Sequence, residues 1–280
     1  MSNTVYFGDN LKLLESLPDE VADLIYIDPP FNTGKMQGRR RLKTVRAEDG
    51  EGDRIGFGGK SYQTEVLGHG NYNDVFADFE AFILPRLQQA YRVLKADGSF
   101  YFHIDYREAH YCKVALDQIF GRENFINEII WAYDFGGRAK DRWPAKHDTI
   151  FFYAKDRLNF TFNVDDIDRI PYMAPGLVGP EKAAKGKLPT DTWWHTIVGT
   201  NSREKTGYPT QKPIGILERI VRASSDPGDL VLDFFAGSGT TGQACLNLGR
   251  KFILCDSNPQ AIEIMKKRFA LNVDIEWKLI

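Results

Sequence analysis

A glycine-rich turn joins a β-prone segment to a helical one near the end of the chain. Residues 230–234 are apolar apart from one aspartate, glycines follow at positions 237, 239 and 242, and residues 240–248 have helical spacing. G-x-G-x-x-G between a strand and a helix is typical of nucleotide-binding units in α/β sheets. Asp256 ends the next β-prone segment, 19 residues after Gly237, where such folds place a carboxylate for ribose hydroxyls. The unit predicts a nucleotide-like ligand at the turn.

The rest of the chain alternates between the same two kinds of segment. The β-prone segments are residues 5–7, 21–27, 99–104, 125–133, 149–153, 230–234 and 252–255, and the helical ones are residues 11–17, 79–94, 111–120, 213–224, 240–248 and 261–270. This alternation predicts an α/β fold with a doubly wound parallel sheet. We expect the last helix to lead back to the first strand, which would place both chain ends at one side of the sheet.

Two segments interrupt the alternation. Residues 36–71 contain eight glycines and seven basic side chains, without periodicity, and we interpret them as a loop insertion. Residues 134–210 mix β-prone stretches with Pro- and Gly-rich ones, and we interpret them as a small insertion or subdomain. The organisation we expect is therefore one domain over residues 1–280 with these two interruptions.

The aspartate before the glycine turn narrows the choice of ligand. Asp233 stands at the end of its strand, where its carboxylate would repel a pyrophosphate. The same charge suits S-adenosylmethionine, which has no phosphate and carries a sulfonium and an ammonium group. A P-loop is excluded, because Gln243 stands where its phosphate-binding lysine belongs. The residues favour S-adenosylmethionine, and the alternative is a glycine turn that serves packing only.

A second motif, Asp28-Pro29-Pro30-Phe31, follows the β-prone segment 21–27. Its parts suit chemistry on an aromatic exocyclic amine, whose lone pair is delocalised into the ring. The Asp28 carboxylate and the Pro29 carbonyl can accept both amino hydrogens, which favours a more tetrahedral nitrogen. Two prolines make these acceptors rigid, and Phe31 offers a flat face for a ring. The alternative is an aspartate turn whose prolines only end a strand.

These two motifs resemble those of amino-group DNA methyltransferases. The matching stretches are residues 28–34 and 235–241, with further similarity at residues 8–10, 97–105, 127–131 and 207–213. The catalytic motif comes first, as in the β class of that family. The resemblance implies a Rossmann-like methyltransferase sheet that is circularly permuted and carries a small target-recognition insertion, here residues 134–210. It also implies direct in-line methyl transfer from S-adenosylmethionine, with no metal.

The resemblance assigns a role to each matching position. Asp28, Pro29, Pro30 and Phe31 would be catalytic, and the cofactor pocket would comprise Asp9, Asn10, Gln211, Lys212, Asp233, Phe235, Ala236, Gly237, Ser238, Gly239, Thr240, Thr241 and Asp256. Asp9 and Asn10 would lie near the adenine, Asp256 would bind the ribose, and the others would hold the methionine part. The chain departs from the family at Phe234 and Ala236, where proline and cysteine are common, and neither side chain is needed for the chemistry.

The partner implied is double-stranded DNA, from which the target base must be flipped out. Candidate phosphate contacts are Arg39, Arg40, Arg41, Lys43 and Arg46 in one cluster, and Arg138, Lys140, Arg142 and Lys146 in another. Acidic side chains are interleaved with the first cluster, so a solvated loop is its alternative. Trp131 and Tyr133 are candidates for stacking on the flipped base, against the more common role of core residues. The net charge is −2, so positive charge must be concentrated on one face.

The function expected is methylation of the N6 amino group of adenine in DNA. Adenine is favoured because the family's cytosine-amino enzymes more often carry serine at the position of Asp28. The alternatives are N4-cytosine methylation, an RNA or protein methyltransferase, and a nicotinamide-dependent oxidoreductase. No cysteine follows a proline, which argues against carbon-5 cytosine enzymes. The lone histidines His103, His147 and His195 lack metal-ligand spacing and are expected in core or surface roles.

The remaining expectations concern location and partners. No apolar run approaches the roughly 18 residues of a membrane span, and the start lacks the pattern of a secretory signal. Three widely spaced cysteines fit a reducing cytosol. We expect a cytoplasmic, nucleoid-associated protein of prokaryotic or phage type, with a homodimer and a cognate restriction enzyme as further candidate partners in restriction–modification.

Overall fold

The computed structural model of the chain describes residues 2–32, 37–46, 54–55, 61–72, 76, 78–137, 139–271 and 274–280. The chain divides into two compact units, one formed by residues 1–31 and 77–280 and the other by residues 32–76. The strands are β1 (Asn3–Phe7), β2 (Ala22–Ile27), β3 (Gln37–Arg46), β4 (Arg54–Ile55), β5 (Ser61–Tyr72), β6 (Leu94–Ile104), β7 (Phe125–Ala132), β8 (His147–Ala154), β9 (Thr192–Trp194), β10 (Leu230–Asp233), β11 (Lys251–Asp256) and β12 (Ile275–Leu279). The helices are α1 (Asn10–Ser16), α2 (Phe79–Val93), α3 (Ala109–Phe120), α4 (Pro180–Lys185), α5 (Ile214–Ala223), α6 (Thr240–Leu248) and α7 (Pro259–Arg268), with short 3-10 helices at Arg122–Asn124 and Pro175–Leu177.

The described part of the larger unit is built on one nine-stranded sheet. Its strand order is β12-β1-β11-β10-β2-β6-β8-β7-β9. The strands from β12 to β6 are mutually parallel, whereas β8 runs antiparallel to both β6 and β7. The structure confirms the doubly wound α/β fold, with the addition of an antiparallel edge that the pattern of segments does not predict.

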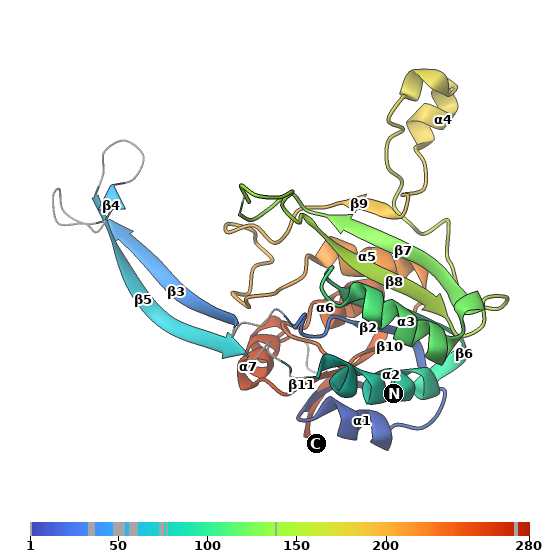
Figure 1. Cartoon of the computed structure of the whole chain (residues 1–280), viewed down its shortest axis with the longest axis horizontal. Helices are drawn as coiled ribbons and strands as arrows, with labels where there is room; N and C mark the ends of the chain where they lie inside the picture. Colours follow the sequence, from blue (N-terminus) through green and yellow to red (C-terminus); the bar gives the residue numbers. More distant parts are fainter. Residues whose placement is uncertain are drawn as a thin grey trace. The chain divides into compact units, whose positions relative to one another are not determined.

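Helices cover both faces of this sheet (Figure 1). Helices α1, α2 and α3 lie on one face, and α5, α6 and α7 lie on the other. Side chains of a strand alternate between the two faces, so Leu24 and Tyr26 of β2 join the core beneath α5, α6 and α7, while Ile25 and Ile27 are buried on the opposite face. Burial on both faces explains why β2 reads as a continuous apolar run before Asp28.

A final strand, β12, joins the two ends of the chain. It pairs with β1 in parallel register from Asn3↔Ile275 to Phe7↔Leu279, and the Ile280 N–H donates to the Phe7 carbonyl at 3.1 Å. Both ends therefore lie at the same side of the sheet, as expected for the permuted order. The expected link from helix to first strand omitted this strand, although Ile275–Leu279 alternates apolar and polar residues in the period of a strand.

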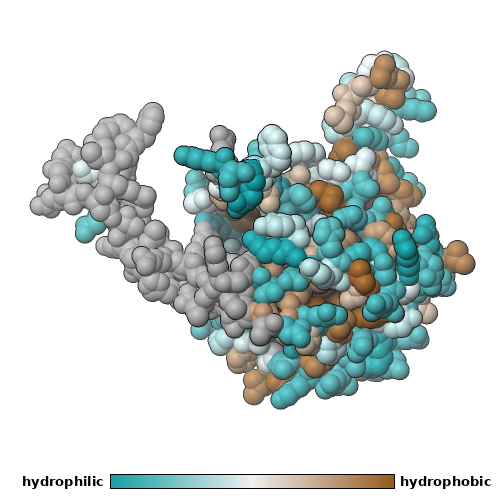
Figure 2. Space-filling view, viewed as in Figure 1, coloured by the Kyte–Doolittle hydropathy of each residue, from teal (hydrophilic) through white to brown (hydrophobic). Residues whose placement is uncertain are grey.

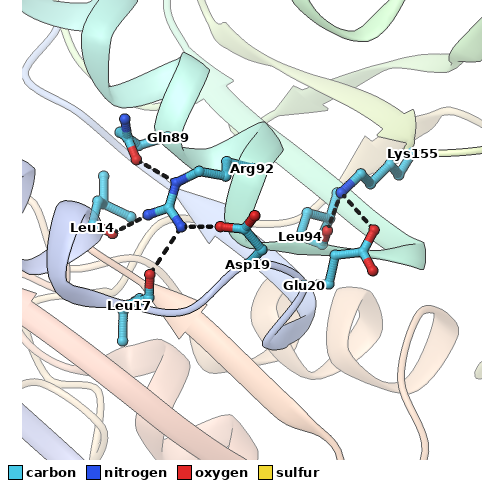
Figure 3. A network of polar contacts seen from close by, with 8 residues as sticks. All are labelled: Leu14, Leu17, Asp19, Glu20, Gln89, Arg92, Leu94 and Lys155. Atoms are coloured by element: carbon cyan, nitrogen blue, oxygen red, sulfur yellow. Dashed lines mark hydrogen bonds and ion pairs between the residues drawn. The ribbon is translucent and has the colours of Figure 1, made fainter.

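A cluster of side-chain bonds fixes the connection that leads into β2 (Figure 3). Arg92 of α2 donates to the carbonyls of Leu14 and Leu17 at the end of α1 and pairs with Asp19 in the following turn. Lys155 adds a bond to the Leu94 carbonyl at 2.6 Å. These bonds join α1 to α2 and β8 to β6, and so hold the start of β2 in register with β6.

The smaller unit is described as a three-stranded antiparallel sheet of order β3-β5-β4. We expected residues 36–71 to be a loop, and this was wrong for the described part. The pairing of β3 with β5 runs from Gln37↔Tyr72 to Arg46↔Tyr62, with an irregularity after Arg41. The backbone supplies the bonds of this ladder, so glycines and charged residues do not prevent it, and the residue pattern gives little sign of it.

Residues 134–210 belong to the larger unit rather than to a subdomain of their own. Strand β8 lies inside the sheet between β6 and β7, and β9 forms its edge. The segment around α4 projects from the sheet and is closed at its base by the bridge Ile170↔Lys187 (Figure 1). Figure 2 shows apolar side chains on this projection, where Met173 and Leu177 are exposed. None of the helices in the described residues has the length and apolar character to cross a membrane.

Candidate active site

The expected site residues gather at one edge of the large sheet. Strands β1, β11, β10, β2 and β6 are neighbours and parallel, so their carboxyl ends lie side by side. Asp9, Asp256, Asp233 and Asp28 each stand at or just after the carboxyl end of one of these strands. In open α/β sheets this edge is where ligands bind.

The glycine turn between β10 and α6 adopts a backbone that other residues rarely take. Gly237 has φ of +50° and Gly239 has φ of +73°. A Cβ on Gly239 would lie 2.7 Å from Cγ of Met265 and 3.0 Å from Cζ of Phe269, both from the last helix. The glycine is needed for the turn and for packing against α7, so the packing alternative describes part of its role.

Asp233 stabilises this turn through hydrogen bonds. Its side chain is buried, one oxygen accepts from the Phe235 N–H at 3.0 Å, and the other accepts from the Thr241 hydroxyl at 2.6 Å. Burial raises the pKa of Asp233 to about 7, against the two hydrogen bonds, and the charges of Asp28 and Asp256 raise it further. Both oxygens of the carboxylate are therefore engaged in shaping the turn.

Asp256 closes the other side of the turn and is more accessible. Its oxygens accept from the Gly237 N–H at 2.7 Å and from the Asn258 N–H at 2.8 Å. Desolvation raises its pKa to about 6, although both backbone bonds lower it. Each carboxylate oxygen has a second lone pair, so Asp256 retains acceptor capacity for a hydroxyl pair.

Asp9 and Asn10 lie at the start of α1, beside the turn. Asp9 caps the helix by accepting from the Leu11 N–H at 2.8 Å, and it is exposed. Asn10 is buried, donates to the Phe234 carbonyl at 2.7 Å and accepts from Arg86 at 2.7 Å. Arg86 was not predicted from the sequence, and it ties α2 to this corner of the site.

The loop before α5 brings Gln211 and Lys212 to the same edge, in different ways. The Gln211 amide is used within its own loop: its oxygen accepts from the Thr206 N–H at 2.7 Å, and its nitrogen donates to the Glu204 carbonyl at 2.7 Å. Lys212 instead places Nζ 2.9 Å from Oδ2 of Asp28. The structure therefore brings Lys212 to the catalytic motif, where the resemblance implied the cofactor's methionine part.

The small hydroxyl residues of the turn complete the connection to this loop. Ser238 and Thr240 lie 3.1 Å apart through their hydroxyl oxygens, and the Thr240 hydroxyl donates to the Lys212 carbonyl at 3.3 Å. Ala236 is buried, and the Phe235 ring packs on Phe82 of α2 with centroids 6.0 Å apart. The turn is thus fixed on both flanks before any ligand binds.

The catalytic motif follows β2 directly, with Pro29 buried and Asp28 partly buried. Oδ2 of Asp28 pairs with Lys212, whereas Oδ1 is buried and has no hydrogen-bond partner in the described structure. The Phe31 ring lies beside this carboxylate, with the Lys212 ammonium 4.8 Å from its centroid. A buried acceptor without a donor is costly, and here it stands beside an aromatic face.

A buried polar chain behind the motif was missed at the sequence level. His103 is fully buried, with Nδ1 2.8 Å from the Tyr26 hydroxyl and Nε2 3.2 Å from Oδ2 of Asp148. The Tyr133 hydroxyl donates to the other Asp148 oxygen at 3.1 Å. Desolvation would raise the pKa of Asp148, but its bonds and the nearby cation Lys212 lower it. The sequence signal for this buried polar chain was a histidine inside an apolar strand, because buried polar groups need hydrogen-bond partners.

Trp131 belongs to the core. It is 2% exposed, its indole N–H donates to the His195 carbonyl at 2.6 Å, and its ring packs against His103. The core alternative therefore holds for Trp131. Tyr133 is partly buried and bonds to Asp148 through its hydroxyl, so a stacking role for its ring stays a prediction, while Phe135 and Trp143 on the following loop are exposed.

The two basic clusters are described unequally. Arg39, Arg40, Arg41, Lys43 and Arg46 all lie on β3, whose backbone alone is described, and Arg138 lies outside the described residues. Lys140 and Arg142 are exposed, Arg142 pairs with Asp141 at 2.8 Å, and Lys146 donates to the Gly136 carbonyl at 2.8 Å. Their loop joins the end of β7 to the start of β8, which is the edge of the sheet that carries Asp28.

Taken together, these groups form a negative edge suited to a cation. Asp28, Asp233 and Asp256 come from three neighbouring strands, and the mutual repulsion of their charges contributes to the raised pKa of Asp233. A cationic ligand beside them would relieve that repulsion, whereas a pyrophosphate would add to it. Among the residues that the structure describes, no three His, Cys, Asp or Glu side chains gather as a metal site.

Comparison with known proteins gives concordant results. The family model described as DNA methylase, which is named for N6 and N4 methyltransferases, matches residues 22–267. The chain is 30% identical over 280 residues to the DNA adenine methyltransferase YhdJ of Escherichia coli (strain K12), covering 95% of this chain and 82% of YhdJ. It is 31% identical over 268 residues to the type II methyltransferase M.HpaI of Haemophilus parainfluenzae, covering 96% of this chain and 74% of M.HpaI.

Among solved structures, the crystal structure of the M1.HpyAVI–SAM complex is similar to this chain. The TM-score is 0.59 at 19% sequence identity, and the match covers 96% of this chain and 99% of that one. This likeness concerns the fold, and it extends over nearly the whole of both chains.

Proposed function

Because this chain belongs to the DNA methylase family, we propose that it transfers the methyl group of S-adenosylmethionine to the N6 amino group of adenine in DNA. The relative YhdJ, a DNA adenine methyltransferase by name, supports adenine as the target. The alternative is the N4 amino group of cytosine, which the name of the family model also covers. RNA, protein and nicotinamide chemistry are set aside, since the family is one of DNA methylases.

One observation carries the chemistry: the unpartnered Oδ1 of Asp28 beside the Phe31 ring. A base stacked on Phe31 brings its exocyclic amine to that oxygen, which accepts one amino hydrogen. The accepted hydrogen bond concentrates the lone pair on nitrogen and aims it away from the carboxylate. Since this acceptor has no donor in the described structure, an arriving amine gains a bond at no loss of another.

The residues of the negative edge fit S-adenosylmethionine. Bound there, it supplies an electrophilic methyl group on a sulfonium, and the carboxylates of Asp233 and Asp256 stabilise its positive charge. Asp256 takes the ribose hydroxyls, and the backbone of Gly237 and Gly239 allows close approach at the turn. The amine nitrogen forms its new bond to the methyl carbon as the carbon–sulfur bond breaks, and the methylated amine then loses a proton to solvent.

DNA reaches this edge through the loops that surround it. The loop carrying Lys140 and Arg142 leaves the sheet at the same edge as Asp28, which supports phosphate contacts near the flipped base. The β3 cluster remains a prediction, with residues 134–210 proposed as the target-recognition region. Phosphate contacts from the loop of Lys140 and Arg142 and from β3 position the duplex, while sequence is read by contacts to base edges.

The biological setting follows from M.HpaI, which is a type II methyltransferase by name. We propose that the methyl mark protects DNA from a cognate restriction enzyme in a cytoplasmic, nucleoid-associated setting. A homodimer is the proposed assembly, which light scattering of the purified protein tests.

Product analysis tests the proposed reaction. Duplex DNA is incubated with the protein and S-adenosylmethionine, digested to nucleosides and weighed, and we expect adenine methylated on its amino group. Asp28→Ala should lose methylation by on the order of a hundredfold or more, in line with the loss of one preorganised hydrogen-bonding group. The variant should still fold and still bind S-adenosylmethionine, because Asp28 stands on a turn and not in the core.

Two results would contradict parts of this proposal. Methylated cytosine in the digest would overturn the base and leave the role of Asp28 intact. Near-normal turnover of Asp28→Ala would overturn the role of the carboxylate, whichever base is modified.

A further inference from the structure

We propose that Lys212 is a positioning residue for methyl transfer, which clamps one oxygen of Asp28 and so holds the other oxygen ready for the target amine. This inference rests on the proposed function and deepens it. The Lys212 ammonium lies 2.9 Å from Oδ2, while Oδ1 of the same carboxylate is buried and has no partner among the described residues. The two oxygens of one side chain are thus divided, one bound to the protein and one kept for a ligand.

The ion pair between Lys212 and Asp28 is largely buried, which strengthens the attraction between the two charges. The side chains of Lys212 and Asp28 are 12% and 16% exposed, so water screens their attraction little. The ammonium also lies over two aromatic faces, 4.8 Å from the Phe31 centroid and 6.0 Å from that of Trp131. Contacts with a carboxylate and two aromatic rings restrict the positions that the ammonium can take.

The backbone of Lys212 is fixed as well. Its carbonyl accepts from the Thr240 hydroxyl at 3.3 Å, at the first turn of α6. The glycine turn and the catalytic motif are therefore linked through this one residue. A cofactor bound at the glycine turn would influence the orientation of Asp28 through the contacts of Thr240 with Lys212 and of Lys212 with Asp28.

A cation is needed at this position because the surroundings of Asp28 are negative. Asp233 faces it from β10 and Tyr26 precedes it on β2, and the charge of Asp28 contributes to the raised pKa of both. Asp148 from β8 is close enough to Lys212 for the ammonium to contribute to its lowered pKa. Without Lys212 the Asp28 carboxylate would stand among like charges with no ion pair to fix its orientation.

The inference separates Lys212 from a cofactor ligand. A lysine that binds the cofactor's carboxylate would, when removed, weaken cofactor binding and leave the rate at saturation nearly unchanged. A lysine that clamps Asp28 would, when removed, lower the rate at saturation and leave the cofactor affinity nearly unchanged. The two roles therefore differ in which of these two quantities changes.

The test compares Lys212→Met with Lys212→Arg and the wild type, each saturated with S-adenosylmethionine and duplex DNA. For Lys212→Met we expect kcat to fall by about tenfold or more, since Asp28 loses a charge-assisted hydrogen bond that orients it. Lys212→Arg keeps the cation and should keep kcat near that of the wild type. Calorimetry should give a cofactor affinity for Lys212→Met close to the wild-type value.

The control is Lys205→Met in the same loop, whose ammonium donates to the Thr200 carbonyl and not to the site. Lys205→Met should leave kcat and the affinity for S-adenosylmethionine unchanged. If circular dichroism shows that Lys212→Met fails to fold, Lys212→Gln replaces it, because its amide offers a donor without a charge.

Three results would overturn the inference. A neutral Lys212 variant with a wild-type kcat would do so, and so would one whose only defect is weaker cofactor binding. The third is an Arg variant whose kcat falls as far as that of the Met variant. A wild-type protein that methylates no DNA would instead overturn the proposed function, and with it the reaction that Lys212 is said to serve.

Discussion

At the residue scale, the three carboxylates of the site differ in what their oxygens contact. Both oxygens of Asp233 are buried and bonded within the turn, those of Asp256 accept from two backbone N–H groups, and one oxygen of Asp28 has no partner among the described residues. The same residue type therefore has three different sets of contacts at one edge of the sheet. Sequence placed all three at strand ends, but the contacts of Asp28 with Lys212 and of Asp256 with Gly237 depend on the fold.

Asp256 provides the prediction at this scale. Asp256→Ala should raise the dissociation constant of S-adenosylmethionine by about tenfold or more, because a hydrogen bond to a charged group contributes roughly 1.5–3 kcal/mol. Titration calorimetry measures it. Asp256→Asn is the matched variant: it keeps an acceptor for the Gly237 N–H and should bind with intermediate affinity. Unchanged affinity in Asp256→Ala would remove this residue from the cofactor site.

The buried chain around His103 shows where residue-level reasoning stops. The histidine, Tyr26 and Asp148 lie on three different strands, β6, β2 and β8. Their proximity depends on the strand order β2-β6-β8, which local spacing does not encode. The sequence indicated only that a histidine in an apolar strand would need partners.

At the element scale, elements with a strong period were predicted and those whose identity depends on pairing were not. The glycine turn, α6 and β11 matched their expected positions, since G-x-G-x-x-G and the apolar periods are local signals. Strands β3 and β5 were taken for a loop, because Arg, Lys and Gly are spread along them and their backbone ladder leaves little trace in residue type. Strand β12 had a usable alternation that lay beyond the last expected helix.

The arginines of β3 give a prediction at this scale. Replacing Arg39, Arg40 and Arg41 by glutamine should weaken binding to all DNA sequences alike. It should also flatten the salt dependence, since each phosphate contact contributes about −0.9 to the slope of log affinity against log salt. Fluorescence anisotropy with several duplexes at several salt concentrations measures both.

A charge-matched control keeps net charge from explaining the result. Lys251 begins β11, Arg122 precedes β7 and Arg157 follows β8, all exposed and at the opposite edge of the sheet from Asp28. Glutamines at these three positions should leave the salt slope unchanged. A loss confined to one duplex in the arginine variant would mean base contacts, and no loss would favour the solvated-segment alternative.

At the scale of the whole molecule, the parallel sheet brings carboxylates from separate sequence motifs together at one negative edge. Asp9, Asp256, Asp233 and Asp28 are spread over most of the chain, yet they end β1, β11, β10 and β2, which are adjacent. The pairing of β12 with β1 places the first and last strands side by side on one flank of the sheet, so the order of motifs can be permuted without altering this edge. The net charge of −2 is therefore compatible with a DNA-binding enzyme whose acidic edge serves the cofactor.

This edge should make cofactor recognition depend on pH in a way that distinguishes two ligands. The pKa of Asp256 is raised to about 6 and that of Asp233 to about 7, so lowering the pH from 8 to 5 protonates both and removes their attraction for a cation. S-adenosylmethionine, with its sulfonium, should bind more weakly at pH 5, by up to about tenfold through a single group of pKa near 6. S-adenosylhomocysteine lacks the sulfonium charge, so its affinity should fall less. Calorimetry of both ligands across this range would therefore show the preference for S-adenosylmethionine shrinking as the pH falls, and a constant preference would mean that these carboxylates do not sense the methyl-bearing charge.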